Sequence, residues 1–172
     1  MMIKKIVSFA ALMLLSVASV NASVMVNFLE GAPKDSFVIT NTGQCSLQAV
    51  RVDIDLTNTT GGLIFDTTAN GAGVEVFQPF EVTKGDIQLK DKASVNDGDK
   101  ILSVIISSIQ PNASVSFTID VDDTMRKSER GMIIVSGAEI ENGLVTVTQG
   151  SVASSGTFGR NSKAMVNMAS CS

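Results

Sequence analysis

Alternation of apolar and polar residues is the dominant pattern along most of the chain. In the segment 49–56, aliphatic residues occupy every second position and charged residues lie between them. The segment 114–120 repeats this arrangement with serine, threonine and aspartate as the polar residues. A period of two is typical of a β-strand that buries one face and exposes the other to water. Both segments are therefore predicted to be strands at the surface of a β-protein.

Further short apolar or β-branched runs follow one another closely, separated by turn-forming sequences such as Asn-Thr-Gly and Asn-Asp-Gly-Asp. They lie at 24–29, 37–40, 63–65, 74–80, 101–106, 132–135 and 144–148, with weaker candidates at 152–158 and 164–168. The stretch 123–130 is long enough for one helical turn. Many short strands at close spacing predict an all-β fold, and we expect an immunoglobulin-like antiparallel β-sandwich of about eight to ten strands.

The N-terminal segment has the three parts of a secretory signal peptide. Lys4 and Lys5 form a basic start, an apolar run covers 6–17, and small residues end at Ala22. The apolar run is shorter than the roughly 20 residues that a membrane-spanning helix needs. We therefore expect residues 1–22 to be cleaved off after Ala22. The mature chain would be a single domain, 23–172, without a transmembrane segment, and it would be periplasmic or secreted.

Charge favours cations as partners of the mature chain. The sequence has 13 basic and 17 acidic residues. Two of the basic residues, Lys4 and Lys5, lie in the predicted signal peptide, so cleavage would leave 11 basic residues and a net charge of −6. A negative surface repels phosphate groups. Nucleic acids and anionic lipids are therefore not expected to bind.

The composition also argues against catalysis, because the chain contains no His, Trp or Tyr. Without His, neither a Ser/His/Asp nucleophile nor an imidazole general base can be built. Without Trp and Tyr, aromatic platforms for sugars or nucleic acids are disfavoured. A glycosidase with paired carboxylates is the best enzyme alternative, but it would lack an aromatic cleft. We expect a protein that is not an enzyme.

The acidic residues are the main candidates for binding chemistry. Asp120, Asp122 and Asp123 lie where a predicted strand ends, and the period of two puts Asp120 and Asp122 on the same face. Carboxylate oxygens at a strand end suit Ca²⁺, and Asp66, Asp97 and Asp99 are candidates for further ligands. The other interpretation is a solvated acidic edge with Asp in its turns, because the ligand spacing of an EF-hand is absent. From the residues alone, both interpretations stay open.

Several blocks of sequence, in their order along the chain, carry a family resemblance. They are Glu30–Asp35, Asn41-Thr42-Gly43 with Cys45, Gly62–Thr68, Gly71–Glu81, Asp97-Gly98-Asp99 and Phe117–Thr124. Together they resemble the core domain of marine sponge aggregation factors and the short secreted bacterial proteins that are similar to it. The resemblance implies a structural adhesion module of the kind that supports calcium-dependent cell aggregation. It also favours the calcium interpretation of Asp120, Asp122 and Asp123.

These observations lead to one expected function and two alternatives. We expect an exported, non-catalytic β-sandwich with a structural role in cell-surface adhesion, cell aggregation or extracellular matrix assembly, assisted by calcium. Its partners would be cell-surface or matrix proteins, glycans, or a second copy. The first alternative is a periplasmic module that binds a small molecule or an oligosaccharide through polar side chains. The second is a fimbrial-type subunit completed by a donated strand.

Cys45 and Cys171 are the two cysteines of the chain, and an oxidising compartment favours a disulfide between them. A bridge that closes so long a loop stabilises the fold by roughly 4 to 5 kcal/mol if loop entropy alone is counted. A pair of free thiols is the competing interpretation. Thiol titration of the denatured, unreduced protein should find no free thiol, and two titratable thiols would contradict the bridge.

Overall fold

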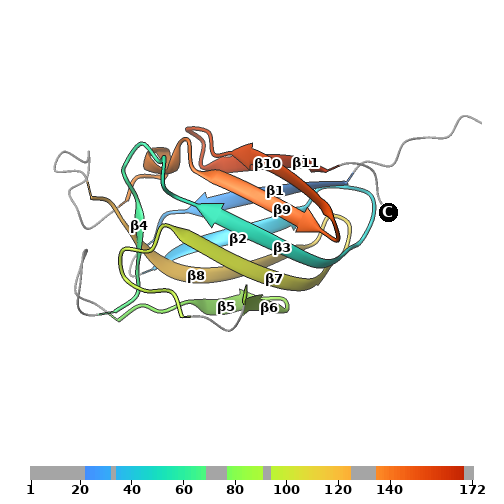
Figure 1. Cartoon of the computed structure of the whole chain (residues 1–172), viewed down its shortest axis with the longest axis horizontal. Helices are drawn as coiled ribbons and strands as arrows, with labels where there is room; N and C mark the ends of the chain where they lie inside the picture. Colours follow the sequence, from blue (N-terminus) through green and yellow to red (C-terminus); the bar gives the residue numbers. More distant parts are fainter. Residues whose placement is uncertain (1–21, 32–33, 69–76, 91–93, 125–134, 169–172) are drawn as a thin grey trace, which may run out of the picture.

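The computed structural model describes residues 22–31, 34–68, 77–90, 94–124 and 135–168. Within these ranges the chain forms eleven β-strands and one short 3-10 helix, η2 (Gly137–Ile140) (Figure 1). The strands are β1 (Ala22–Leu29), β2 (Asp35–Asn41), β3 (Leu47–Asp55), β4 (Ile64–Asp66), β5 (Glu81–Lys84), β6 (Ile87–Leu89), β7 (Ile101–Ile109), β8 (Ser114–Asp122), β9 (Leu144–Gln149), β10 (Val152–Thr157) and β11 (Lys163–Met168). The predicted all-β class is confirmed.

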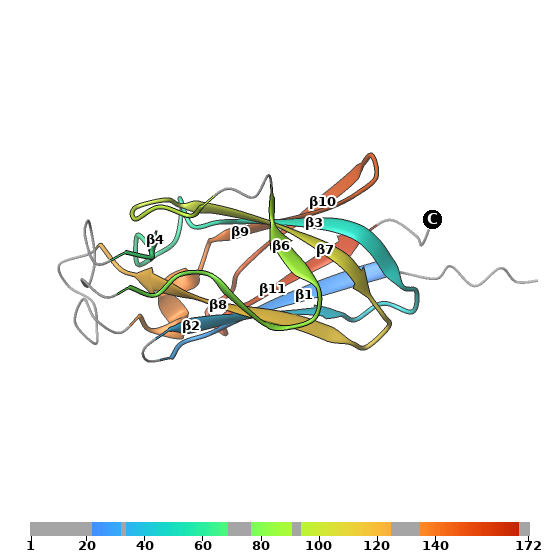
Figure 2. The ribbon, with the colours of Figure 1, turned by 90° about the horizontal axis from the view of Figure 1, so that it is seen from below.

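The strands form two antiparallel sheets. The first has the order β11-β1-β2-β8, and both β4 and β5 pair with the far edge of β8. The second has the order β10-β9-β3-β7-β6. Figure 2 shows the sheets from the side, with β3 and β9 in one layer and β1, β2 and β8 in the other. The predicted antiparallel arrangement is confirmed.

One hydrophobic core lies between the sheets and draws its residues from both. Phe37 on β2 is central to it, because its ring centroid lies 5.1 Å from that of Phe28 and 5.3 Å from that of Phe117. The ring of Phe65 on β4 joins this group at 6.4 Å. In β1 and β2, buried residues alternate with partly exposed ones, as the period of two predicted.

Most predicted strands are present, with boundaries that shift by a few residues. The exceptions are short or irregular elements. Residues 77–80 are not in a strand, and the strand β5 begins only at Glu81. Val135 is not in a strand either. The rest of the candidates 74–80 and 132–135, and all of the expected helical turn beyond Thr124, lie outside the described residues. The strands β5 and β6 were not predicted, because runs of three or four residues show no periodicity.

A hairpin crosses between the sheets at each side of the sandwich, and each crossing contains a glycine. Gly85 connects β5 in the first sheet to β6 in the second and has φ +86°. A Cβ atom at this position would lie 2.4 Å from Cγ1 of Val115. At the other side, a Cβ atom on Gly156 of β10 would lie 2.2 Å from the carbonyl oxygen of Met165 on β11. Only glycine allows these close approaches.

The two ends of the described chain lie side by side. Ala22 pairs with Met168 across β1 and β11, and its side chain is buried. Residues 1–21, which make up nearly all of the expected leader, lie outside the described residues, as does Cys171. The cleavage site and the bridge to Cys45 therefore stay predictions. Within the described ranges no helix has the length and apolar character needed to cross a membrane.

The crossing at Gly85 yields a stability prediction with a matched control. Gly85→Ala places a methyl group against Val115 at a positive φ, whereas Gly98 has φ +85° and open space around it. Gly98→Ala should lower the free energy of unfolding by about 1 kcal/mol, the cost of the backbone conformation. Gly85→Ala should cost about 2 to 4 kcal/mol, because overpacking adds to that strain. Urea denaturation measures both values, and equal losses would contradict the close packing of this hairpin.

Candidate metal centre

Pairing between β4 and β8 brings three aspartates together. Asp66 lies directly opposite Asp120, and Asp122 lies one step further along the same face of β8. Carboxylate oxygens of the three residues lie within 4.8 Å of one another. The side chains are buried, with exposed fractions of 2% for Asp66, 8% for Asp120 and 2% for Asp122. We call this group the aspartate triad.

The short strand β4 is held in place from both sides. On one side it pairs with β8, and on the other side it contacts the turn 96–99. The amide of Phe65 donates to the carbonyl of Asp99 at 2.8 Å, and the amide of Gly98 donates to the carbonyl of Phe65 at 2.9 Å. The ring of Phe65 is buried in the core. This packing fixes Asp66, the next residue, against β8.

A fourth buried carboxyl group, Asp35, lies on the opposite side of β8. Asp35 is the first residue of β2, and its side chain bridges two backbone amides. Oδ1 accepts from the amide of Gly31 at 3.0 Å, and Oδ2 accepts from the amide of Val121 at 3.1 Å. Val121 lies between Asp120 and Asp122, so this bond helps to position the triad. Asp35 was not among the predicted site residues, because only the β2–β8 pairing brings it to this place.

Burial raises the pKa of these carboxyl groups. The pKa of Asp66 rises to about 7 because of burial, its hydrogen bond with Asp122, and the negative charges of its neighbours. Burial and the charge of Asp122 raise the pKa of Asp120 to about 7, although the Val121 amide and Lys34 act to lower it. The pKa of Asp35 rises to about 8, mainly through burial. All three groups therefore keep their protons to a much higher pH than an ordinary aspartate does.

The triad can be neutralised in two ways. In the first, protons stay on the carboxyl groups, and the hydrogen bond between Asp66 and Asp122 requires one such proton. In the second, a cation replaces the protons. Ca²⁺ takes oxygen ligands at about 2.3 to 2.6 Å, so two ligands on opposite sides of one ion are roughly 4.6 to 5.2 Å apart. The separation of the triad oxygens is compatible with a shared ion.

The other predicted ligands lie near the triad but not within it. Asp97 accepts hydrogen bonds from the amides of Thr67 and Thr68, each at 2.8 Å, and from both hydroxyl groups. Burial acts to raise the pKa of Asp97, but these bonds outweigh it and lower the pKa to about 2. The Oδ2 atom of Asp99 accepts from the amide of Asn96 at 2.8 Å. Asp97 and Asp99 thus stabilise the turn that holds β4.

Asp123 follows directly after β8 and is buried. It does not belong to the group of carboxylates that converges at the triad. The structure therefore brings together three of the six predicted ligands, Asp66, Asp120 and Asp122. A direct role for Asp97, Asp99 or Asp123 in holding a cation stays a prediction.

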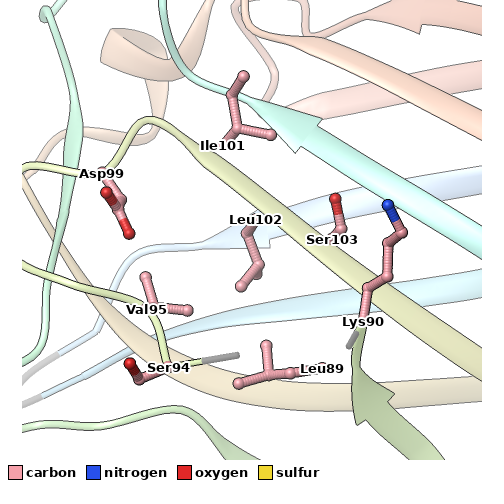
Figure 3. A pocket seen from close by; sticks show the side chains of 8 residues that line it. All are labelled: Leu89, Lys90, Ser94, Val95, Asp99, Ile101, Leu102 and Ser103. Atoms are coloured by element: carbon pink, nitrogen blue, oxygen red, sulfur yellow. The ribbon is translucent and has the colours of Figure 1, made fainter. Parts of the chain in front are cut away.

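Pockets elsewhere on the molecule do not include the triad. Figure 3 shows one of about 240 Å³ beside the start of β7, where Lys90 and Asp99 lie on opposite sides of Leu89, Val95 and Leu102. A second, of about 300 Å³, is apolar and includes Phe80. A third, of about 540 Å³, lies between the ends of β1 and β11. No triad residue lines any of these three pockets.

Comparison with known proteins gives no identification, since no protein-family model, no curated protein and no solved structure matches this chain. The geometry of the triad is therefore the main observation on which a function can be proposed.

The raised pKa values predict how stability changes with pH when no metal is present. The folded protein keeps protons on Asp35, Asp66 and Asp120 up to pH values of about 7 to 8, whereas the unfolded chain releases them near the ordinary aspartate pKa of 3.8. The folded state binds more protons in this window. The free energy of unfolding in EDTA should therefore fall as pH rises from about 4 to about 8.

Asp66→Asn should reduce the fall of the free energy of unfolding with rising pH. It should also stabilise the metal-free protein at pH 8, because an amide can bond to Asp122 without carrying a charge. Asp55→Asn, at a partly exposed position of β3, is the matched control and should keep the slope of the wild type. Urea denaturation between pH 4 and pH 8 measures the effect. Stability that rises with pH in EDTA would contradict the raised pKa values.

Proposed function

We propose that this protein is an exported, non-catalytic β-sandwich of the immunoglobulin-like type that binds Ca²⁺ at the aspartate triad. In this proposal it has a structural role in cell-surface adhesion, cell aggregation or extracellular matrix assembly. The convergence of Asp66, Asp120 and Asp122 is the observation that supports the proposal most strongly. The signal-like leader and the resemblance to sponge aggregation factor cores support the adhesive role.

The ligand chemistry favours Ca²⁺ over other metals. The triad offers only carboxylate oxygens, and the chain has no His to complete a zinc site. Mg²⁺ demands near-ideal octahedral geometry and gives up its water reluctantly, whereas Ca²⁺ tolerates irregular sets of six to eight oxygens. Extracellular calcium modules bind with dissociation constants of about 10⁻⁴ to 10⁻³ M. An exported protein meets Ca²⁺ in this range.

Binding of Ca²⁺ would stabilise one edge of the first sheet. β4 is only three residues long, and its pairing with β8 places like charges directly opposite each other. Such a pair is destabilising when both groups are ionised. A bound cation would attract both carboxylates, and this attraction would outweigh their repulsion and hold β4 against β8. As pH rises through neutrality and the triad loses its protons, this edge of the sandwich would then depend increasingly on Ca²⁺, as a calcium-assisted adhesion module requires.

One observation favours the ligand-binding alternative. The pocket of about 540 Å³ is lined largely by polar side chains, including Asn27, Arg160, Asn161 and Lys163. These groups can bond to a polar small molecule or an oligosaccharide without aromatic stacking. A thermal-shift screen that finds stabilisation by sugars and no response to Ca²⁺ would favour this alternative over the adhesion module.

Calcium binding is tested by isothermal titration calorimetry and thermal denaturation of the mature protein at pH 7.5, in EDTA and in Ca²⁺. A Ca²⁺ concentration 100 times the dissociation constant should stabilise by about 2.7 kcal/mol, or roughly 5 to 10 °C in Tm. Asp66→Asn and Asp120→Asn should lose most of this shift. Asp55→Asn should keep it. A wild-type Tm that is the same in EDTA and Ca²⁺ would refute the metal centre.

Adhesion needs a separate test with the same variants. Beads coated with the mature protein should aggregate in Ca²⁺ and disperse in EDTA, and beads coated with Asp120→Asn should stay dispersed in both. Aggregation of wild-type beads that persists in EDTA would contradict the role of calcium. A wild type that binds Ca²⁺ but never aggregates beads would leave the metal centre in place and contradict the adhesive role.

A further inference from the structure

β10 is the outer strand of the second sheet, and one of its edges is free of backbone partners among the described residues. On its inner side it pairs with β9 at six positions, from Val152 opposite Gln149 to Thr157 opposite Leu144. On its outer side, the residues 152–155 have no backbone hydrogen bond to another described segment. All six residues of β10 are exposed or partly exposed, and Val152 is 45% exposed. This edge can accept another strand.

The sequence of β10 lacks the features that normally protect a free edge. Its residues are Val-Ala-Ser-Ser-Gly-Thr, with no charged residue and no proline. Proteins usually block free edges with charges, prolines, bulges or very short strands. The outer strands β5 and β6 follow this rule, because β5 contains Glu81 and Lys84 and β6 has only three residues. β10 is the exception among these three outer strands.

The available part of the edge is the half of β10 nearest the β9–β10 turn. At the other half, Gly156 lies against the carbonyl of Met165, so β11 covers the strand there. In Figure 2 the β9–β10 turn stands clear of the rest of the sandwich, at the upper right. A strand from another molecule can therefore approach the residues 152–155 without meeting the body of the protein.

We propose that the outer edge of β10 pairs antiparallel with β10 of a second copy, which joins the two five-stranded sheets into one continuous sheet. This inference rests on the proposed adhesive function and specifies one partner for it, a second copy of the same chain. Antiparallel pairing of identical strands produces a closed two-fold dimer. The surface that each copy contributes is the same segment, 152–155.

The chemistry of β10 fits its own copy. Charged residues would meet residues of the same sign across a two-fold axis, and β10 has none. Ser154 can bond to the hydroxyl group of Ser154 in the other copy. In the joined sheet, the core-facing sides of the two copies lie on the same face only if the two-fold axis passes through a residue of β10. A shift of the pairing by one position would place the core-facing side of one copy next to the outward side of the other. Ser154 opposite its own copy satisfies this condition near the middle of the open segment.

The contact is small, and this sets the expected strength. Stable protein interfaces bury about 1,200 to 2,000 Å² in total, which is more than a four-residue strand pair supplies. The mature net charge of −6 adds repulsion between copies. The dimer should therefore be weak in dilute solution and should form when many copies are held close together on a surface, where effective concentrations are high.

Analytical ultracentrifugation of the mature protein over a wide concentration range tests the proposal. The weight-average mass of the wild type should rise from monomer toward dimer with concentration. Val152→Lys places a charge, which proteins use to block free edges, at the start of the paired segment, and it should weaken dimerisation at least tenfold. Val82→Lys is the matched control, because Val82 is a 37% exposed valine on the outer strand β5, and this variant should dimerise like the wild type. Ser155→Lys is a second variant if Val152→Lys does not fold.

A wild type that stays monomeric at the highest concentration would overturn the proposal, even if β10 binds a strand of a different protein. Dimerisation of both lysine variants at wild-type strength would also overturn it, because the contact would then lie elsewhere. Slower deuterium exchange of the β10 amides at high concentration is the expected independent signature. Measurement of Tm in EDTA and Ca²⁺ on the same samples separates this proposal from the metal centre, since Val152→Lys should keep the calcium shift.

Discussion

Burial of like charges at the β4–β8 pair is the constraint that governs the stability and the proposed chemistry of this protein. Asp66 and Asp120 face each other directly, and Asp122 and Asp35 add to the same electric field. Protein interiors tolerate such groups only when protons or cations neutralise them. The sandwich can bury its large phenylalanine core next to this cluster only because one of these two forms of neutralisation is available. In the proposed function, the choice between protons and a cation depends on pH and on the concentration of Ca²⁺.

The supports of the triad are spread over distant parts of the sequence. Asp35 contributes hydrogen bonds at the start of β2, and the turn 96–99 holds β4 from the other side through Asp97 and two backbone bonds. Loss of neutralisation at the triad would therefore destabilise β2, β4 and β8 together. The free edge of β10 belongs to the second sheet, so the proposed metal binding and the proposed self-association would use different surfaces of the same module. Such a separation would allow the β10 contact to be removed without loss of metal binding, whereas loss of Ca²⁺ would destabilise the module that carries both.

The sequence alone was sufficient for the all-β class and for most strands, because periodic alternation survives in β1, β2, β3 and β8. It was not sufficient for β5 and β6, which are too short to show a period and exist because Gly85 lets the chain cross between the sheets. Asp120 and Asp122 were predicted on one face from local spacing. Asp66 could be named only as a candidate, and Asp35 was missed, because cross-strand register is not visible in a single sequence.

A crystal structure of the mature protein grown at pH 7.5 with Ca²⁺ is the most direct test of calcium binding at the triad. We predict one anomalous-scattering peak among Asp66, Asp120 and Asp122, with six to eight oxygen atoms at about 2.3 to 2.6 Å. Two findings would contradict the metal centre. One is the absence of a peak at saturating Ca²⁺, with Asp66 and Asp122 still sharing a proton. The other is a lysine or arginine side chain that occupies the position of the ion.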